Sequence, residues 1–424
     1  MRIAYISYEY PPDTAHGGIA TYVAQAARTM VRRGHEVEVF SASPHRQETV
    51  VSGGVVENFI LAKNYDEFAK AVTGVFTDRH RAQKFDILEA TEWQADARFA
   101  AAQAPDVALV VKMHTPTILI DRINKKFQTR DYPLDPVFFS IWLKAAIHPD
   151  SASPWIKRLA RFYISRERRN KLYQLEREFT LTADIVAPLC SDLSDFAVGY
   201  WGVPRANVRL MPNPYAANED YLAIPSVSKG KVVGFVGRLE RRKGIEIFAK
   251  AIPRILDADP SASVRLFGQP VLHVSGLLYD EWLRRRLRKY MSRIEILGKV
   301  PLDQMHEVYA GLDICVFPSI WENFPNVCLE AMSAGRAIVA SDGGGMREML
   351  DNGRCGSIVP SGDYRSLASA VVALLQDVDQ RNRFGAVARE RVLAAYHPDV
   401  IGKLMEDVYQ EAIRRARVRR HDGC

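Results

Sequence analysis

Two stretches in the second half of the chain combine charged side chains with glycines at the ends of predicted strands. The first is GRLERRKG at residues 237–244, which directly follows the apolar run VVGFVG and sets Arg238 five residues before Lys243. A forked guanidinium and a compact ammonium suit the two phosphates of a nucleotide diphosphate. Taken alone, the stretch is equally consistent with a polar turn whose charges are solvated.

The second stretch is WENFPNVCLEAMSAG at residues 321–335, after the apolar run DICVFPS. Pro325 cannot lie inside a helix but suits a first helical turn, so we expect Glu322 in the entering loop and Glu330 early in the helix. A carboxylate that accepts two hydroxyls fits a ribose or a pyranose diol. The first backbone amides of such a helix would point toward an anion. These amides belong to Asn326, Val327 and Cys328.

Weaker candidates lie in the first half of the chain. His16, Gly17 and Gly18 follow the first predicted strand, and adjacent glycines before a helix allow a ligand to approach the backbone closely. His114 ends the apolar run VVKMH, so we expect it at the mouth of a cleft, although a lone histidine is more often structural. Asp13, Glu89 and Glu92 are still weaker candidates near the same rim.

Apolar runs that alternate with helical patterns must position these residues. The first half opens with a strand at 3–7, a helix at about 19–33 that Gly34 ends, and a strand at 35–43. The other apolar runs lie at 85–90, 107–114, 184–188, 232–237, 264–268, 293–298, 313–319, 337–341 and 357–360. Such alternation predicts two parallel, doubly wound α/β domains, at 1–211 and 212–395. Residues 396–424 form an amphipathic helix, which we expect to pack back on the first domain.

Length and composition narrow the class of protein. The 424 residues suffice for two domains, and the net charge of +7 is too mild to indicate nucleic acid by itself. The five cysteines are scattered, which disfavours a disulfide framework or a zinc site. No apolar stretch approaches the ~18–20 residues of a membrane span, and the N-terminus resembles a strand rather than a signal peptide. We therefore expect a cytoplasmic protein.

Several motifs of other enzyme classes are absent from the sequence. It contains neither GxxxxGK[ST] nor a GxGxxG after the first strand, which disfavours a P-loop NTPase or a standard dinucleotide dehydrogenase. Two Asp-x-Asp triplets, at 257–259 and 377–379, lie where amphipathic helices end. We interpret both as solvated helix termini rather than as metal sites.

An insertion at 120–180, rich in aromatic and basic residues, interrupts the first domain. Between residues 157 and 171 seven basic side chains accompany a single Glu167. The run is either a solvated helical face or a contact with an anionic acceptor or membrane surface. A second basic run, RRRLRK at 284–289, leaves nucleic-acid binding as an alternative, although no recognition motif supports it.

Together these motifs resemble the retaining glycosyltransferases of family 4, the glycosyl transferases group 1. The resemblance spans essentially the whole chain and rests on Gly17-Gly18, His114, GRL…KG, the E-x7-E pair and GGGMREM at 343–349, which contains Glu348. It implies the GT-B fold, in which two Rossmann-like domains face a central cleft and the C-terminal helix crosses back to the N-terminal domain. The sequence departs from the family at Asn213-Pro214-Tyr215, where an Asn-Gly-Val-Asp-like turn is common.

The resemblance also implies roles for particular residues. Arg238 and Lys243 would hold the diphosphate, Glu330 the ribose, and Glu322 and His114 the donor sugar, so His114, Glu322, Arg238 and Lys243 are the predicted catalytic residues. The remaining donor-binding residues would be Gly17, Gly18, Gly268, Val300, Asn323, Phe324, Pro325, Asn326 and Val327. Tyr8, Glu9, His16 and Glu92 would face the acceptor.

The predicted reaction is transfer of a hexosyl group from a UDP-type donor, with retention, to a saccharide or lipid-linked acceptor at the inner face of the membrane. No cofactor and no metal ion are expected. The alternatives are a GT-B-type epimerase or phosphorylase and a non-catalytic nucleotide-sugar-binding module. The presence of both Glu322 and Glu330 argues against the non-catalytic module.

Overall fold

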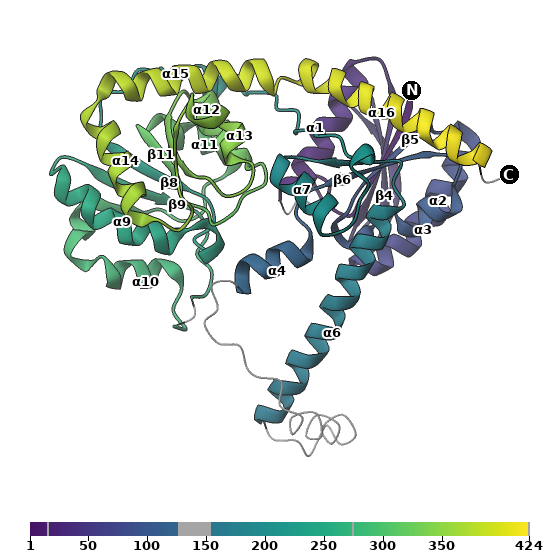
Figure 1. The fold of residues 1–424 in the computed structure, drawn as a ribbon, viewed down its shortest axis with the longest axis horizontal. Coiled ribbons are helices and arrows are strands. Elements are labelled where there is room, and N and C mark those ends of the chain that lie inside the picture. The colour runs from purple at the N-terminus through teal and green to yellow at the C-terminus, as the bar shows by residue number, and fades with distance from the viewer. Residues whose placement is uncertain (15–16, 126–153, 274, 423–424) are drawn as a thin grey trace.

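The computed structural model describes residues 1–14, 17–125, 154–273 and 275–422. These residues form two α/β halves, each built around one sheet (Figure 1). The strands of the first half are β1 (Arg2–Ser7), β2 (Glu36–Ser43), β3 (Glu48–Ser52), β4 (Val55–Leu61), β5 (Ile87–Thr91), β6 (Ala108–Met113) and β7 (Ile185–Pro188). Its helices are α1 (Gly18–Arg32), α2 (Tyr65–Gln83), α3 (Arg98–Gln103), α4 (Thr117–Lys125), α6 (Pro154–Leu181) and α7 (Ser191–Gly199).

The second half repeats this pattern. Its strands are β8 (Val232–Val236), β9 (Ser263–Phe267), β10 (Ile294–Ile296), β11 (Ile314–Phe317), β12 (Ala337–Ser341) and β13 (Ser357–Val359). Its helices are α8 (Glu219–Leu222), α9 (Ile245–Ala258), α10 (Tyr279–Arg286), α11 (Met305–Ala310), α12 (Asn326–Ser333), α13 (Met346–Met349), α14 (Tyr364–Gln376) and α15 (Val378–Ala395). The last helix is α16 (Pro398–Asp422).

Both sheets have the predicted doubly wound order. The first runs β3-β4-β2-β1-β5-β6-β7 and the second β10-β9-β8-β11-β12-β13. Every neighbouring pair is parallel except β3 and β4, which form an antiparallel hairpin that the sequence patterns did not predict. The direction of winding reverses between β1 and β5 and between β8 and β11. In open α/β sheets ligands bind outside the carboxyl ends of the strands at such a reversal.

Burial explains why these segments are strands. All residues of β5, β6, β11 and β12 are buried, as expected of parallel strands whose sheets are covered by helices on both faces. The helix α1 ends just before Gly34, whose φ of +83° lies in the left-handed region that favours glycine. The Asp-x-Asp triplets lie at helix termini, as predicted: Asp259 caps the end of α9, and Asp377 ends α14 and begins α15.

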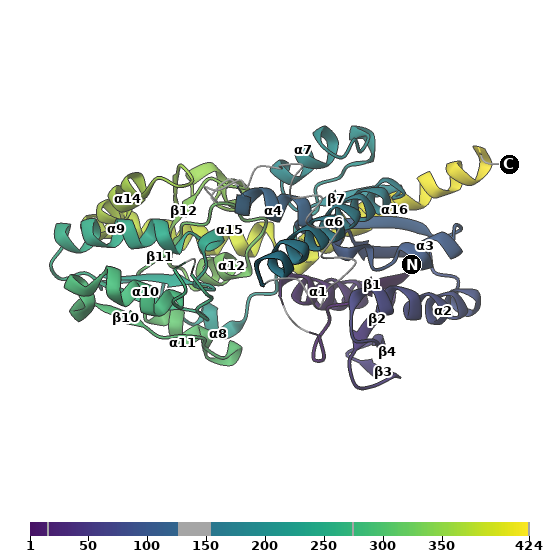
Figure 2. The same cartoon turned by 90° about the horizontal axis from the view of Figure 1, so that it is seen from below.

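The last helix joins the two halves. Figures 1 and 2 show α15 lying over the second half and α16 continuing across the first. Tyr409 of α16 donates its hydroxyl to Glu89 Oε2 at 2.6 Å, and Tyr22 of α1 donates to Glu89 Oε1 at 2.5 Å. The Tyr5 hydroxyl is hydrogen-bonded to that of Tyr409 at 2.9 Å. The predicted return of the C-terminal helix to the first half is therefore confirmed.

Charged pairs also connect α16 to the same half. Arg33 donates to both carboxylate oxygens of Glu406, at 2.9 and 2.7 Å. Arg209 makes a similar two-point contact with Glu411, at 2.8 and 2.6 Å. Planar guanidinium and carboxylate groups match in this geometry, so the pairs also fix the orientation of the helix.

Replacing Tyr409 with phenylalanine is expected to lower the free energy of unfolding by about 1–3 kcal/mol, because it leaves the fully buried Glu89 carboxylate with an unpaired oxygen. Thermal denaturation should show a fall in melting temperature of a few degrees. The control is Tyr290→Phe, which removes a hydroxyl contact with Asp257 that is exposed to solvent. Equal melting temperatures for the two variants would contradict the expectation.

The predicted insertion overlaps α4 and the long helix α6, which extends away from the first sheet (Figure 1). Residues 126–153 of this insertion lie outside the described residues. Along the described chain, no helix combines the length and apolarity that crossing a membrane requires.

Candidate active site

The two charged stretches of the second half lie side by side, because the strands they follow, β8 and β11, are neighbours at the winding reversal. Gly244 makes their close approach possible. Its φ is +77°, and a Cβ there would lie 1.8 Å from the Pro318 carbonyl oxygen. The Ile320 amide also donates to the Arg242 carbonyl at 2.9 Å. The loops after β8 and β11 therefore form one joined surface.

On that surface Glu322 is paired with two cations. Its Oε1 lies 2.6 Å from Lys243 Nζ and 3.2 Å from Arg242 Nη1, and only 9% of its side chain is exposed. Burial opposes ionisation of Glu322, but Lys243 and Arg242 outweigh it and hold the pKa of the carboxyl below its usual range. The site therefore presents an ionised carboxylate beside fixed positive charge.

Arg242 was not predicted as a site residue. The GRLERRKG motif contains four cations, and the sequence pattern does not show which of them turn inward. The 3₁₀ turn Arg241–Lys243 points Arg242 toward Glu322 and Glu240, at 3.2 and 3.0 Å. Arg238 lies at the edge of the cluster, 3.2 Å from Glu240, with 60% of its side chain exposed. The four side chains Arg238, Glu240, Arg242 and Glu322 thus form a connected chain of charges.

A small cavity borders this chain of charges. Its lining comes from β8, β11, the loop after each strand and the start of α12: Phe235, Val236, Lys243, Phe317, Ser319, Glu322, Pro325 and Val327. The cavity volume is only about 10 Å³. It nevertheless brings predicted residues from both motifs onto one wall.

The helix α12 begins as expected after Pro325, which lies at its N-cap. The Cys328 amide is not free for a ligand, because it donates to the Pro325 carbonyl at 3.0 Å. Glu330 lies one turn inside the helix and accepts the Tyr309 hydroxyl at 2.9 Å. Burial raises the pKa of Glu330.

Phe324, in the loop before α12, packs edge-on against Tyr396, with ring centroids 5.0 Å apart.

The Gly343-Gly344-Gly345 run supports the loop that carries Glu322. The Gly345 amide donates to the Glu322 carbonyl at 2.8 Å, and the Glu322 amide donates to the Gly343 carbonyl at 3.2 Å. A Cβ on Gly343, Gly344 or Gly345 would lie 2.3, 2.0 or 2.1 Å from a backbone oxygen of residues 320–323. The run therefore has to be glycine for the two backbones to pair.

Another close backbone approach occurs at the ends of β8 and β9. Gly268 has a φ of +142°, and a Cβ there would lie 1.9 Å from the Gly237 carbonyl oxygen. The Gly268 amide donates to Gly298 at 2.6 Å, and Val300 is half-buried nearby in sequence. Backbone groups thus dominate the region around Gly268 and Val300, which were predicted to bind the donor.

His114 lies where the carboxyl end of β6 meets the second half. Asn323 donates its side-chain amide to the His114 carbonyl. The imidazole is buried rather than open at a mouth, packs edge-on against Tyr22 at 5.2 Å, and has no hydrogen-bond partner for Nε2 within the described chain. Burial and Lys112 lower the pKa of His114 to about 3, so the ring is neutral at pH 7.

The predicted acceptor-side residues occupy different environments. Glu92 is fully buried and accepts the His114 amide at 2.9 and 2.8 Å, which makes it a support for that loop rather than an exposed contact. Burial raises its pKa to about 8. The Tyr8 and Tyr65 rings pack in a tilted arrangement with centroids 4.1 Å apart, and the Tyr65 hydroxyl donates to Glu9 at 3.1 Å.

The glycines predicted at the same rim lie at the start of α1. Gly17 is its N-cap and Gly18 its first residue, and a Cβ on Gly17 would lie 3.9 Å from Glu9 Oε2. His16 lies outside the described residues.

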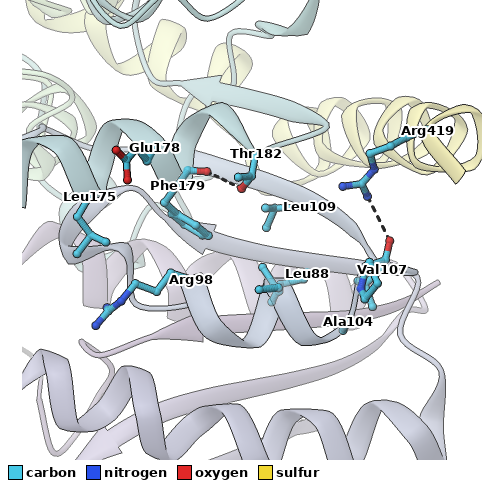
Figure 3. A pocket seen from close by; sticks show the side chains of 13 residues that line it. Leu88, Arg98, Ala104, Val107, Leu109, Leu175, Glu178, Phe179, Thr182 and Arg419 are labelled. Atoms are coloured by element: carbon cyan, nitrogen blue, oxygen red, sulfur yellow. Dashed lines mark hydrogen bonds between the residues drawn. The ribbon is translucent and has the colours of Figure 1, made fainter. Parts of the chain in front are cut away.

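Within the described ranges, no group of three or more His, Cys, Asp or Glu side chains lies together as a metal ion would require. A larger cavity, of about 360 Å³, lies elsewhere, between α3, the end of α6 and the end of α16 (Figure 3). Leu88, Leu109 and Phe179 line it, and it contains none of the predicted site residues.

Two family models match the chain. The model of the glycosyl transferase 4-like domain matches residues 17–214, and that of the glycosyl transferases group 1 matches residues 230–377. Glycogen synthase of Mycobacterium tuberculosis is 23% identical over an alignment of 451 positions, gaps included. The alignment covers 98% of this chain and 96% of that protein.

Solved structures agree with the fold. Sucrose-phosphate synthase from Thermosynechococcus elongatus superposes with a TM-score of 0.69 at 20% identity, covering 97% of this chain and 98% of that one. HepE from Anabaena, in complex with UDP-glucose, gives a TM-score of 0.64 at 16% identity, covering 97% of this chain and 99% of that one. The chain belongs to the glycosyl transferases group 1, with the GT-B fold, and is a retaining glycosyltransferase of family 4 that uses a nucleotide sugar.

Proposed function

We propose that the protein transfers a hexosyl group from a UDP-sugar, with UDP-glucose as the favoured donor, to a hydroxyl of a saccharide or glycolipid. The observation that carries the proposal is the buried Glu322 carboxylate held at 2.6 Å by Lys243 at the winding reversal of the second sheet. HepE, which shares the fold, has been crystallised with UDP-glucose. That likeness supports the choice of donor.

Lys243, Arg242 and Arg238 would stabilise the leaving diphosphate. The bond between C1 of the sugar and the phosphate oxygen breaks, and charge develops on that oxygen. Cations already fixed in place by Glu322 and Glu240 need little reorganisation to stabilise it. Lys243 lies nearest to Glu322, so we assign it the main contact with the phosphate.

The donor sugar would lie between Glu322 and His114. The ionised Glu322 can accept sugar hydroxyls. The neutral imidazole of His114 could contact a further hydroxyl through Nε2, which has no hydrogen-bond partner among the described residues. In a same-face pathway the acceptor oxygen bonds to C1 on the side that the phosphate leaves, and its proton passes to the departing phosphate oxygen. The transfer then proceeds with retention and needs no protein nucleophile.

We also propose that the transfer is independent of metal ions, takes part in exopolysaccharide or glycolipid assembly, and occurs at the inner face of a membrane. The 157–171 run and the exposed cations Arg284, Arg285 and Lys289 supply positive charge for an anionic surface. Co-sedimentation with anionic vesicles would test the membrane contact, and protein left in the supernatant would contradict it.

A thermal-shift panel of nucleotide sugars in EDTA tests the donor and the metal dependence together. UDP-glucose is expected to raise the melting temperature more than ADP-, GDP- or TDP-sugars do, to the same extent with EDTA as with Mg²⁺. Donors that shift the melting temperature are then incubated with saccharide acceptors and the products are analysed. Stabilisation that requires Mg²⁺, or transfer only to phosphate, would contradict the proposal.

A further inference from the structure

Two carboxylates reach between the halves in opposite directions. Asp192, in the first turn of α7 in the first half, accepts the Gly344 amide of the second half, with N to Oδ2 at 3.1 Å. Glu348 of α13 in the second half accepts the Ser191 amide of the first half, with N to Oε1 at 2.8 Å. We call these two reciprocal contacts the clasp.

The clasp lies beside two further contacts between the halves. The Asn323 side chain donates to the His114 carbonyl and accepts from Cys190 Sγ at 3.3 Å. Cys190 directly precedes Ser191, so the clasp and Asn323 hold the same segment of the first half. The loops after β6 and β7 are thereby joined to the loops after β11 and β12.

The clasp is coupled directly to the predicted donor-sugar site. Gly344 forms a parallel bridge with Glu322, and the residues on either side of it exchange backbone hydrogen bonds with Glu322. On the other side, Asn323 ties the same loop to His114. Any movement of Ser191 and Asp192 away from the second half would therefore separate His114 from Glu322.

The main chain of Glu348 is anchored within the second half. Arg391 of α15 donates to the carbonyls of Glu348 and Met349, at 2.7 and 2.8 Å. The carboxylate thus projects from a short helix whose end is anchored. Burial and the nearby Glu348 raise the pKa of Asp192, so placing the two acids together has a cost that the amide contacts offset.

We propose that Asp192 and Glu348 are positioning residues, which hold the two halves together without contacting the donor. We call the arrangement in which both clasp contacts are made the closed arrangement. The inference rests on the proposed function, because it assigns the donor sugar to the space between His114 and Glu322. A ligand that binds only the closed arrangement has an apparent affinity reduced by the fraction of molecules that are closed. Loss of the clasp should therefore weaken binding of the sugar part and leave binding of the nucleotide part unchanged.

The test compares UDP with UDP-glucose by isothermal titration calorimetry on the full chain. Glu348→Ala and Asp192→Ala are each expected to raise the Kd of UDP-glucose about tenfold and to leave the Kd of UDP within about twofold. Glu348→Gln, which keeps an oxygen acceptor for the Ser191 amide, should lose less. The radius of gyration of the double alanine variant from small-angle X-ray scattering should exceed that of the wild type.

Asp195→Ala is the matched control. Asp195 lies on the same helix, α7, and pairs with Arg205 of the first half. An unchanged Kd of UDP shows that a variant is folded. If wild-type protein binds UDP-glucose and the two clasp variants bind it equally well, the clasp proposal is overturned while the proposed function stands. If wild-type protein binds neither ligand, the proposed function itself fails.

Discussion

Replacing Lys243 with alanine is expected to lower kcat/KM for the donor by about 10²–10³-fold, which corresponds to about 2.7–4 kcal/mol of lost transition-state stabilisation. Two effects combine. The leaving diphosphate loses the cation that we assign to it, and Glu322 loses the partner that lies 2.6 Å from its carboxylate. Since burial opposes ionisation of Glu322, its pKa should rise when the ammonium is removed.

The measurement is release of UDP from the donor identified in the panel, at several donor concentrations and between pH 5 and 9. Lys250→Ala is the matched control, since Lys250 is an exposed lysine on the following helix, α9. Lys243→Arg keeps the charge but not the compact shape, so it should recover part of the activity. Wild-type kinetics in Lys243→Ala would remove Lys243 from the diphosphate site.

The second large effect is expected at Gly244, where an alanine should reduce activity about 100-fold or more without removing any charged group. Its φ of +77° disfavours a Cβ, and that Cβ would lie 1.8 Å from the Pro318 carbonyl oxygen. The loops after β8 and β11 must then separate, and Lys243, the adjacent residue, must move relative to Glu322. A displacement of about 1 Å in an active site can cost about 100-fold in rate.

Gly362→Ala is the control that separates the effect of backbone strain from the effect of displacing the loops after β8 and β11. Gly362 has a φ of +87°, but a Cβ there would meet no atom within 4 Å. Both variants should lose about 1–2 kcal/mol of stability from the backbone conformation, whereas only Gly244→Ala should lose activity. Activities are compared below the melting temperature of each variant. Equal activities would show that the joined loops do not determine the position of Lys243.

Much of the fold could be predicted from short apolar runs that alternate with helical segments. Such runs are expected because the strands of a parallel sheet are buried when helices cover both of its faces. The β3–β4 hairpin was missed because β3 is almost entirely exposed and lacks such a run. Its turn, Gly53-Gly54, has φ values of +57° and +83°. A Gly-Gly pair between two β-branched segments was the signal that could have revealed it.

The site could be predicted only in part. Lys243 and Glu322 follow neighbouring strands, so the doubly wound order was enough to predict their proximity. The inward turn of Arg242 depends on the 3₁₀ geometry of its loop. The contact of the His114 carbonyl with Asn323 joins residues more than two hundred positions apart in the chain, which no local pattern reveals.

The position of Tyr409 has a consequence for biosynthesis. A ribosome delivers the first sheet long before α16. Among the described residues, however, the Glu89 carboxylate on β5 accepts hydroxyl hydrogen bonds from Tyr22 and from Tyr409 of α16. Until α16 has been synthesised, the nascent first half contains a buried carboxylate that lacks one hydrogen-bond donor, so we expect its folding to be completed only after that of the second half. Residues 1–211 made alone should accordingly be marginally stable, and a separate peptide of residues 396–424 should rescue them. Synthesis of α16, rather than completion of the first sheet, then sets the moment at which the first half is stabilised.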